Sequence, residues 1–408
     1  MKILMPVKKI MLIETESDYG VVNSLSYSMA DAFEKQHRDV LLLGSDQANH
    51  FEKYFLQFKP DFTFSFNVAP LFFGDNIPFF DFFQSPHFSY FLDHPINLFP
   101  YYQIAQSKHL FISCVDPNTI HFLTEKIKFD KEHVFWLPHC LDHLEFQPDI
   151  PKEFDVAIGA TFEDPKIISN EWSKVLEPFI VQIMEKMIEF IVESDYQLNA
   201  IDALHYSLNN MGFSLSPQDL REFEKVLYQQ VDIFTRLKKK NELLKIFGDF
   251  PVRCYGKIPP PHIKSLAPQW TFCGPLLSKD LNKEISKSRI QLHFHHNLHH
   301  AAHERVLRGL FSKSLVLGEW SMFFEDAFED CLSLFHLSNA KSEGKEKILE
   351  LLNNKPLFDE KVNLGYQKGL ENFTVESRAE QILEIMDYFH DQKELESIIP
   401  PAVPSTTL

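Results

Sequence analysis

The chain of 408 residues is longer than one ordinary hydrophobic core requires, so two domains are expected. Its composition, with 44% apolar and 24% charged residues, is that of a globular protein, and its formal net charge is −17. This charge argues against a nucleic-acid backbone or an anionic membrane as the main partner, yet it permits a small anionic ligand in a local basic pocket.

Short apolar runs alternate with helical or polar segments in the first part of the chain. This alternation is typical of a parallel sheet that is covered by helices on both faces. A polar loop that contains Gly20 leads into an amphipathic helix at 22–35. We predict strands at 9–14, 39–44, 62–68, 77–83, 109–115 and 133–139. Residues 1–150 are therefore predicted to form a Rossmann-like N-terminal domain.

A second series of strands follows the segment FQPDIPKEF at 146–154, whose two prolines suit a linker. We predict strands at 155–161, 252–257, 270–275, 289–295, 314–319 and 331–337. The sequence thus predicts an α/β protein in which two doubly wound, Rossmann-like domains face a cleft. The second domain spans 151–390, and the proline-rich residues 391–408 are expected to form a flexible tail.

A helical insertion, at about 165–247, separates the first two strands of the second domain. Ser216 is predicted to cap its last helix, Pro217 suits the first helical position, and Asp219 completes a capping box. Apolar residues then recur at three- and four-residue steps on one face of this helix. Extra core, a homodimer surface and acceptor recognition are the roles that we weigh for the insertion.

Cysteine usage and the N-terminal sequence bear on the compartment. The five cysteines are scattered and form no CxxC pair, which is typical of reduced thiols. The start of the chain, MKILMPVKKIMLIE, lacks the features of a signal peptide. No run approaches the roughly 20 apolar residues of a membrane span. We therefore expect a cytoplasmic protein without a membrane span or a nucleic-acid partner.

The stretch HFHHNLHHAAHERVLRGLF at 293–311 concentrates histidines between a predicted strand and a predicted helix. His299 and His303 are four residues apart and would share a helix face, as metal ligands do. No HExxH motif occurs, however, and no nearby Asp or Cys completes a ligand set. We predict no metal here, and a histidine-dependent metalloprotein is the weaker hypothesis. Several of these histidines are expected to face solvent.

The same stretch suits an anion better than a metal. It lies at the carboxyl end of a predicted strand, and the helix that follows presents unpaired N–H groups and a positive dipole end. Asn297, His303 and Arg305 add side-chain donors. Arg305 would neutralise negative charge on a diphosphate that leaves as a sugar bond breaks. The alternative is that Arg305 is an ordinary surface residue on a first helical turn.

The segment HNLHHAAHERVLRGLFSKSLVLGE at 296–319 resembles the GT-B fold glycosyltransferases, and among them the CgeB-like (spore-maturation type) family. That family has an Asn, a short loop, a His-x-Arg pattern, and a strand that ends in an acidic residue. Asn297, His303, Arg305 and Glu319 match this pattern. The segments QSPHFSYF, FWLPHCLD and RLKKKNELLKIFGDFPVRCYGK are also similar to family segments, so the resemblance spans nearly the whole chain outside the insertion.

The resemblance implies transfer of a sugar from a nucleotide-sugar donor to an acceptor, in the cleft and without a metal cofactor. It places the acceptor on the N-terminal domain and the donor on the second domain. Asn297, His303, Arg305 and Glu319 would bind the donor, and His303 and Arg305 would also serve catalysis. The sequence does not identify the sugar, the base or the acceptor.

Two positions depart from the family pattern. Arg308 stands where the family has a glutamate that holds the ribose of the donor, and Lys313 stands where it has a glycine. Arg308 would instead bind an additional phosphate or carboxylate on the donor. Alternatively, the two changes mark a non-catalytic protein that uses the same fold for binding or as a scaffold.

Three loop residues complete the predicted site. Gly20 would let the backbone approach a ligand across the cleft. Lys257, directly after a Tyr-Gly pair, would reach a phosphate. Asp93, beside His94, would act as acid or base near an acceptor hydroxyl if the enzyme inverts the anomeric centre. The alternatives are a plain loop glycine, a solvated lysine and a structural or solvated loop.

Overall fold

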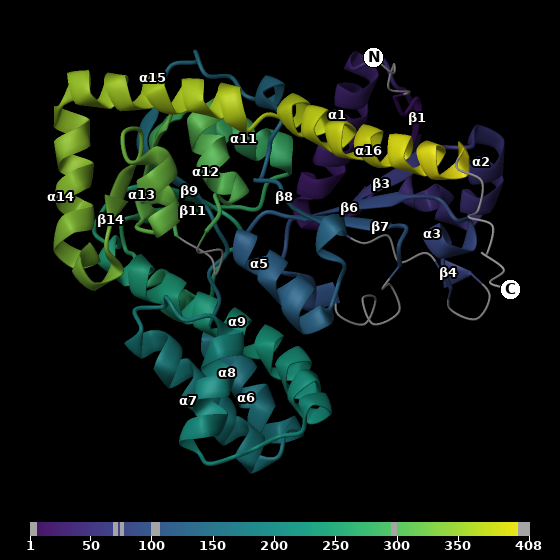
Figure 1. Cartoon of the computed structure of the whole chain (residues 1–408). Helices are drawn as coiled ribbons and strands as arrows, with labels where there is room; N and C mark the ends of the chain where they lie inside the picture. The colour runs from purple at the N-terminus through teal and green to yellow at the C-terminus, as the bar shows by residue number, and fades with distance from the viewer. Residues whose placement is uncertain (1–5, 68–71, 74–76, 99–106, 295–299, 399–408) are drawn as a thin grey trace, which may run out of the picture.

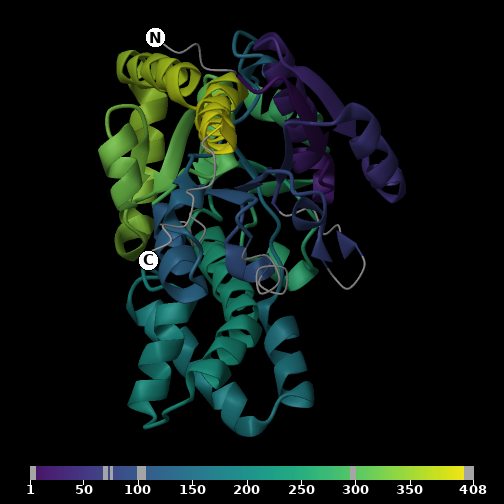
Figure 2. The same cartoon turned by 45° about the vertical axis from the view of Figure 1, so that its right-hand side comes forward.

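The computed structural model describes residues 6–67, 72–73, 77–98, 107–294 and 300–398. They form two parallel six-stranded sheets with flanking helices. The helices α6 to α9, within 165–246, form a separate lobe that projects from the part of the molecule containing the sheets (Figure 1 and Figure 2). The prediction of an α/β fold with two doubly wound domains and a helical insertion is thus confirmed. Among the described residues, no helix has the length and hydropathy that crossing a bilayer requires.

The first sheet has the strand order β2-β1-β3-β6-β7-β8. Its strands are β1 Lys9–Ile13, β2 Asp39–Leu43, β3 Phe62–Phe66, β6 His87–Phe91, β7 Leu110–Cys114 and β8 Val134–Trp136. A small antiparallel pair consists of β4 Phe72–Phe73 and β5 Ile77–Pro78. The helical segments of this part are η1 Asp18–Gly20, α1 Val21–Lys35, η2 Ser45–His50, α2 Phe51–Phe58, α3 Phe79–Phe82, η3 Pro95–Leu98, α5 Pro117–His121, η4 Phe122–Ile127, η5 Lys131–His133 and η6 His143–Glu145.

The second sheet has the order β11-β10-β9-β12-β13-β14, which is the Rossmann order and reverses between β9 and β12. Its strands are β9 Phe154–Gly159, β10 Val252–Tyr255, β11 Trp270–Gly274, β12 Ser288–His293, β13 Leu315–Glu319 and β14 Ser333–Phe335. Its helical segments are α10 Pro261–Lys264, α11 Ser278–Ser286, α12 Glu304–Phe311, α13 Met322–Phe328, η7 Leu337–Asn339, α14 Ala340–Asn353, α15 Lys355–Asn372 and α16 Val375–Ile398.

The fourth strand of the first sheet differs from the prediction. A strand predicted at 77–83 is wrong, because this segment forms the two-residue strand β5 and then helix α3. The strand is β6, whose five residues are all buried. Its polar residues concealed it in the sequence: His87 bonds inside the sheet to Thr63 Oγ1, at 2.8 Å, and to Ser65 Oγ, at 3.2 Å. A histidine with two such partners is structural.

The insertion consists of α6 Pro165–Val175, α7 Pro178–Glu193, α8 Ala200–Asn210 and α9 Pro217–Ile246. The predicted cap of α9 is confirmed, since Ser216 Oγ accepts from Asp219 N at 3.1 Å and Pro217 takes the first position. One end of α9 packs into a core shared with the first domain, through Leu227 and Val231. Its other end packs into the core of the second domain. This one continuous helix therefore contacts both domains.

Helix α16 returns the chain to the first domain and lies beside α1 (Figure 1). Arg38 on the first domain pairs with Asp387 on α16 at 3.1 Å. The two crossings between the domains also touch, because Leu141 and Thr374 form a bridge. Residues 391–398, predicted as part of a flexible tail, continue α16, whereas 399–408 lie outside the described residues.

Candidate functional site

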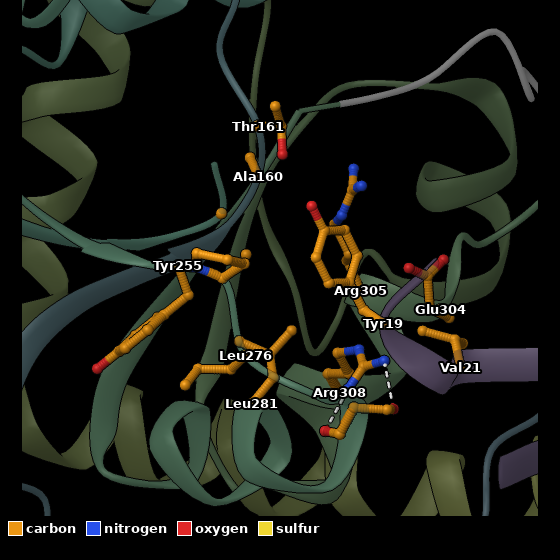
Figure 3. A pocket seen from close by; sticks show the side chains of 14 residues that line it. Tyr19, Val21, Ala160, Thr161, Tyr255, Leu276, Leu281, Glu304, Arg305 and Arg308 are labelled. Carbon is orange, nitrogen blue, oxygen red and sulfur yellow. Dashed lines mark hydrogen bonds between the residues drawn. The ribbon is translucent and has the colours of Figure 1, made fainter. Parts of the chain in front are cut away.

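A pocket opens where the carboxyl ends of β9, β10 and β11 face the first turns of α11 and α12 (Figure 3). This edge of an open α/β sheet is where ligands bind. The first domain contributes two lining residues, so the pocket lies between the domains. The lining residues are Tyr19, Val21, Gly159, Ala160, Thr161, Tyr255, Gly256, Pro275, Leu276, Ser278, Leu281, Glu304, Arg305 and Arg308.

Tyr19 reaches the pocket because of an unusual backbone conformation. Tyr19 and Gly20 both have left-handed backbone angles, with φ values of 63° and 69°. This conformation costs a non-glycine residue about 1–2 kcal/mol. The turn is held by side chains: Ser17 Oγ accepts from Val22 N at 2.9 Å, and Asn23 Oδ1 accepts from Ser17 N at 3.0 Å. Strain of this kind is commonly retained at functional sites.

The first turn of α12 faces the pocket and is fixed from two sides. His303 is its N-cap, and its Nδ1 accepts from Arg305 N at 3.4 Å. Burial lowers the pKa of His303 to about 4, against the opposing charge of the Glu304 carboxylate, which contacts the same Nδ1. The Arg305 carbonyl accepts from Gln291 Nε2 at 2.7 Å, which ties the turn to β12. Arg305 is thereby held with its side chain at the pocket (Figure 3).

Three cations converge beside this turn. Lys240, on α9, donates from Nζ to the carbonyl of Thr161 at 3.3 Å. Burial and, after it, the nearby charges of Arg305 and Arg236 together lower the pKa of Lys240 to about 7. Arg236 also reduces the pKa of Arg305, whose main perturbation is burial. Asp232 pairs with Arg236 at 2.6 Å, so Arg305 and Lys240 carry the positive charge that this cluster offers to an anion, in a chain whose net charge is strongly negative.

Glu319 ends β13 and is fully buried. Its carboxylate forms an ion pair of 2.5 Å with Lys239 of α9, whose side chain is buried as well. The pair joins the second sheet to the helix that carries Arg236 and Lys240. In the described structure Glu319 therefore orients α9, and its predicted contact with a donor stays a prediction.

Arg308 lines the same pocket but directs its guanidinium at α11 (Figure 3). It is 2% exposed, and it donates to Ser278 Oγ at 3.1 Å, to the Ser278 carbonyl and to Asn282 Oδ1. Lys313 has a φ of 48°, which explains the preference of the resembling family for glycine there. Its amine pairs with Asp149 at 2.7 Å, on the domain linker.

The other predicted donor-binding residues lie at the margin. Gly20 does not line the pocket, although its left-handed conformation helps to place Tyr19 in it. Lys257 is exposed and pairs with Glu163 at 3.7 Å. Asn297 lies outside the described residues. Their roles as ligands stay predictions.

The predicted pair of Asp93 and His94 is divided by the fold. The His94 ring packs near Phe122 and Tyr228, and its Nδ1 accepts from Ile96 N at 3.2 Å, so His94 is structural. Asp93 instead interacts with His139, which opposes the rise in the Asp93 pKa that desolvation causes.

His139 extends this group across the domain boundary. Its ring centroid lies 6.0 Å from that of His303 on the second domain. Burial lowers the pKa of His139, against the opposing charges of Glu304 and Asp93. Asp93, His139, His303 and Glu304 thus form a titratable group between the domains, next to the cationic cluster.

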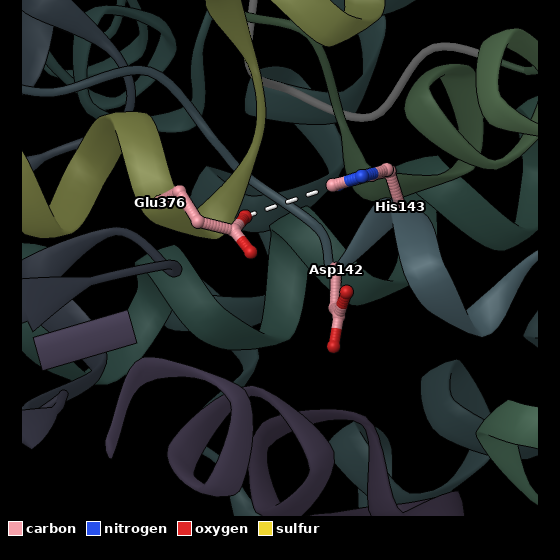
Figure 4. A group of neighbouring side chains, drawn as sticks. All are labelled: Asp142, His143 and Glu376. Carbon is pink, nitrogen blue, oxygen red and sulfur yellow. Dashed lines mark ion pairs between the residues drawn. The ribbon is translucent and has the colours of Figure 1, made fainter. Parts of the chain in front are cut away.

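One group of described residues brings three potential metal ligands within 4.8 Å of one another, namely Asp142, His143 and Glu376 (Figure 4). It lies where the two crossings between the domains meet, and the ring centroid of His143 lies 6.3 Å from that of Phe311 at the end of α12. Its carboxylates already have partners: Asp142 Oδ2 accepts from Ser28 Oγ at 2.8 Å, and Glu376 pairs with Lys35 at 2.9 Å. These contacts indicate a structural joint between the linker and α16.

Sequence reasoning missed four residues of this site: Tyr19, Arg236, Lys240 and His139. The signal for Tyr19 was its position beside Gly20 after the first strand, but the sequence favoured Gly20 as the functional residue. The signal for Arg236 and Lys240 was the basic run RLKKK at 236–240, and the signal for His139 was the Pro-His pair after β8. None of these patterns indicates by itself which other segment the side chain will meet.

Two facing Rossmann-like domains, a ligand pocket between them and a final helix that crosses back to the first domain define the GT-B fold. Solved glycosyltransferases share this arrangement. The chain is similar to a glycosyltransferase from Rickettsia africae, with a TM-score of 0.55 and 11% identity over 94% of this chain and 98% of that one. No protein-family model and no curated protein matches the chain in sequence.

Two further solved structures show the same fold. A sucrose-phosphate synthase from Thermosynechococcus elongatus has a TM-score of 0.53 and 9% identity, over 96% of this chain and all of that one. An α-glucosyltransferase in complex with UDP and a 13-mer DNA has a TM-score of 0.51 and 12% identity, over 93% of this chain and 99% of that one. At these identities the likeness concerns the fold.

Proposed function

We propose that the protein is a glycosyltransferase that moves a sugar from a nucleotide-sugar donor to an acceptor held in the cleft. The convergence of Arg305, Lys240 and Arg236 beside the pocket carries this proposal. A fold that hosts many functions does not define an activity, whereas a cationic cluster at the ligand-binding edge has a chemical use. We further propose a specific relationship with the CgeB-like family, on the motif that includes His303 and Arg305.

The donor would bind with its nucleoside in the pocket and its diphosphate at the cations. Tyr255, Leu276 and Leu281 offer apolar surface for a base, and Tyr19 closes the pocket from the first domain. In the transfer, the bond between the anomeric carbon and the diphosphate oxygen breaks, and its electron pair remains on the diphosphate. Arg305 and its neighbours compensate this charge. We therefore propose a reaction in which protein cations replace a metal ion.

Asp93 is the proposed base for the acceptor. It would accept the proton of the acceptor hydroxyl while that oxygen bonds to the anomeric carbon, which gives inversion. Asp93 is exposed, so that an acceptor hydroxyl can reach it, as proton transfer to a base requires. His139 and His303, neutral at pH 7, would orient Asp93 and the transferred sugar from the two sides of the domain boundary.

A non-catalytic binding protein on the same fold is the second candidate. Two residues that the family resemblance places at the donor have protein partners instead, and this favours the second candidate. Glu319 pairs with Lys239, and Arg308 donates to Ser278. Such a protein would still bind nucleotides at the cationic cluster. It would not hydrolyse a nucleotide sugar or transfer its sugar.

A nucleotide screen tests the proposal. We expect one of UDP, dTDP, ADP, GDP and CDP to raise the melting temperature, since a ligand at 100 times its Kd adds roughly 2.7 kcal/mol of stability. UDP is the first choice because an α-glucosyltransferase of the same fold was solved with it. The matching nucleotide sugars are then incubated with the protein, and the release of nucleoside diphosphate is measured. Binding without any release would favour the non-catalytic alternative, and no binding would refute both.

A further inference from the structure

A chain of polar contacts connects the floor of the pocket to the linker between the domains. Arg308 donates to Asn282 Oδ1 on α11, and Asn282 Nδ2 donates to Glu145 Oε2 at 3.0 Å. The other oxygen of Glu145 accepts from Ser24 Oγ on α1 and lies 3.7 Å from Lys279 Nζ. Four separate elements are thus joined: α12, α11, the linker turn η6 and α1 of the first domain.

These contacts join the two opposite sides of the pocket. Tyr19 and Val21 line the pocket from the first domain. Ser24 lies one helical turn after Val21 on α1. At the other end, Arg308 and Ser278 line it from the second domain. Glu145 lies between the two sides and belongs to neither. It therefore connects the first-domain side of the pocket with its second-domain side.

The members of this chain are buried strongly enough to act as fixed supports. Asn282 is 1% exposed and Arg308 is 2% exposed, and the Glu145 side chain is 13% exposed. Removal of one side chain leaves a buried polar group of its neighbour without a hydrogen bond. Because this is unfavourable, the neighbour is expected to move toward another partner. A change at Glu145 would thus be transmitted to Arg308 and to the pocket floor.

We propose that Glu145, Asn282 and Arg308 are positioning residues that hold the pocket walls at the spacing a nucleotide needs and so couple nucleotide affinity to the conformation of the domain linker. This inference rests on the proposed function, because it concerns the same pocket. It gives Arg308 a role other than contact with an additional phosphate of the donor. Glu145, which lines no part of the pocket, becomes a determinant of affinity.

A double-mutant cycle tests the proposal by combining a change at Tyr19, which lines the pocket from the first domain, with a change at the positioning residue Asn282. The probe is whichever of UDP, dTDP, ADP, GDP and CDP the wild type binds best, and Kd is measured by calorimetry. We expect Tyr19→Ala to weaken binding about 10-fold in the wild type but less than about 2-fold in Asn282→Ala, because the wall is no longer held in place there. Glu145→Gln should weaken binding about 5-fold, since its amide cannot accept from both Ser24 and Asn282.

Two controls separate positioning from general damage. Asp149→Asn removes a carboxylate from the same linker that is exposed and pairs with Lys313, and it should change Kd less than about 2-fold. Arg308→Lys keeps the positive charge but loses the forked geometry of the guanidinium, so it can replace only part of the contacts to Ser278 and Asn282. Its Kd should therefore lie between those of the wild type and Asn282→Ala. Urea unfolding of each variant should show no coupling between Tyr19 and Asn282, which make no bond to each other.

The outcomes are distinct. Equal effects of Tyr19→Ala in both backgrounds, with all proteins folded, would overturn the inference and leave the proposed function intact. The same holds if Asp149→Asn weakens binding as much as Glu145→Gln. A wild type that binds none of the five nucleotides would overturn the proposed function, and this inference with it.

Discussion

Lys240 offers a sharp test of the cationic cluster, because its charge is expected to depend on bound phosphate. Burial and the charges of Arg305 and Arg236 lower its pKa from 10.5 to about 7, while Glu163 opposes this shift. A diphosphate at the cluster would restore the pKa toward its ordinary value. The free protein must then take up a proton to bind at any pH above about 7. The neighbouring His303, with a pKa of about 4, does not titrate in this range.

The size of the effect follows from the lowered pKa of Lys240. Between pH 6 and pH 8.5, the protonated fraction of a group with a pKa of about 7 falls roughly 30-fold. The Kd of a nucleotide sugar, whose diphosphate does not titrate in this range, should rise by the same factor, which equals about 2 kcal/mol. Lys240→Arg, which stays charged, should bind equally at both pH values. Lys240→Met should bind weakly at both.

Calorimetry in two buffers of different ionisation enthalpy measures the proton directly. We expect close to one proton taken up at pH 8.5 and almost none at pH 6. Equal affinities at the two pH values, with wild type and Lys240→Arg indistinguishable, would show that Lys240 does not meet the phosphate. The cluster would then lose its main argument as a diphosphate site.

Three further predictions concern other parts of the site. Arg305→Ala should raise the Kd of a nucleoside diphosphate by roughly 10- to 150-fold, and Arg305→Lys should raise it less. Calorimetric titration of the two folded variants measures this, and an unchanged Kd for Arg305→Ala would remove Arg305 from the site. Asp93→Asn should lower the rate of sugar transfer at saturation by about 10²- to 10⁴-fold without changing the Kd for nucleotide, and a normal rate would remove Asp93 as the base. Lys313→Gly should be about 1 kcal/mol more stable in urea than Lys313→Ala, because both lose the Asp149 contact and only glycine adopts the left-handed backbone freely; equal stabilities would contradict this.

Much of the fold was readable from the sequence because its signals are local. Apolar runs marked five of the six strands of the first sheet and all six of the second, and Ser216 marked the start of α9. The exception was β6, where His87 and Ser89 made a buried strand look like a polar loop. Burial of those side chains depends on Thr63 and Ser65 of the neighbouring strand, and no local pattern records that neighbour.

The site was only partly readable, for the same physical reason. Arg305 could be predicted at this edge of the sheet because a strand, a loop and a helix start follow one another directly in the chain. Arg236 and Lys240 reach the same place from α9, more than sixty residues earlier, and only the packing of that helix brings them there. Arg308 lines the pocket as expected, but its partners Ser278 and Asn282 are set by how α11 lies against α12.

Helix α9 explains how an acidic protein maintains a basic site. Close cations repel one another, so they stay together only where the structure holds them. One end of α9 is packed against the first domain through Val231 and the other against the second-domain core through Leu243. Between these ends, the buried pair of Lys239 and Glu319 fixes the rotation of the helix, which directs Lys240 at Thr161. The insertion thus supplies Arg236 and Lys240 to the cation cluster and contacts both domains, so a motion that separates the domains would also disturb the cluster.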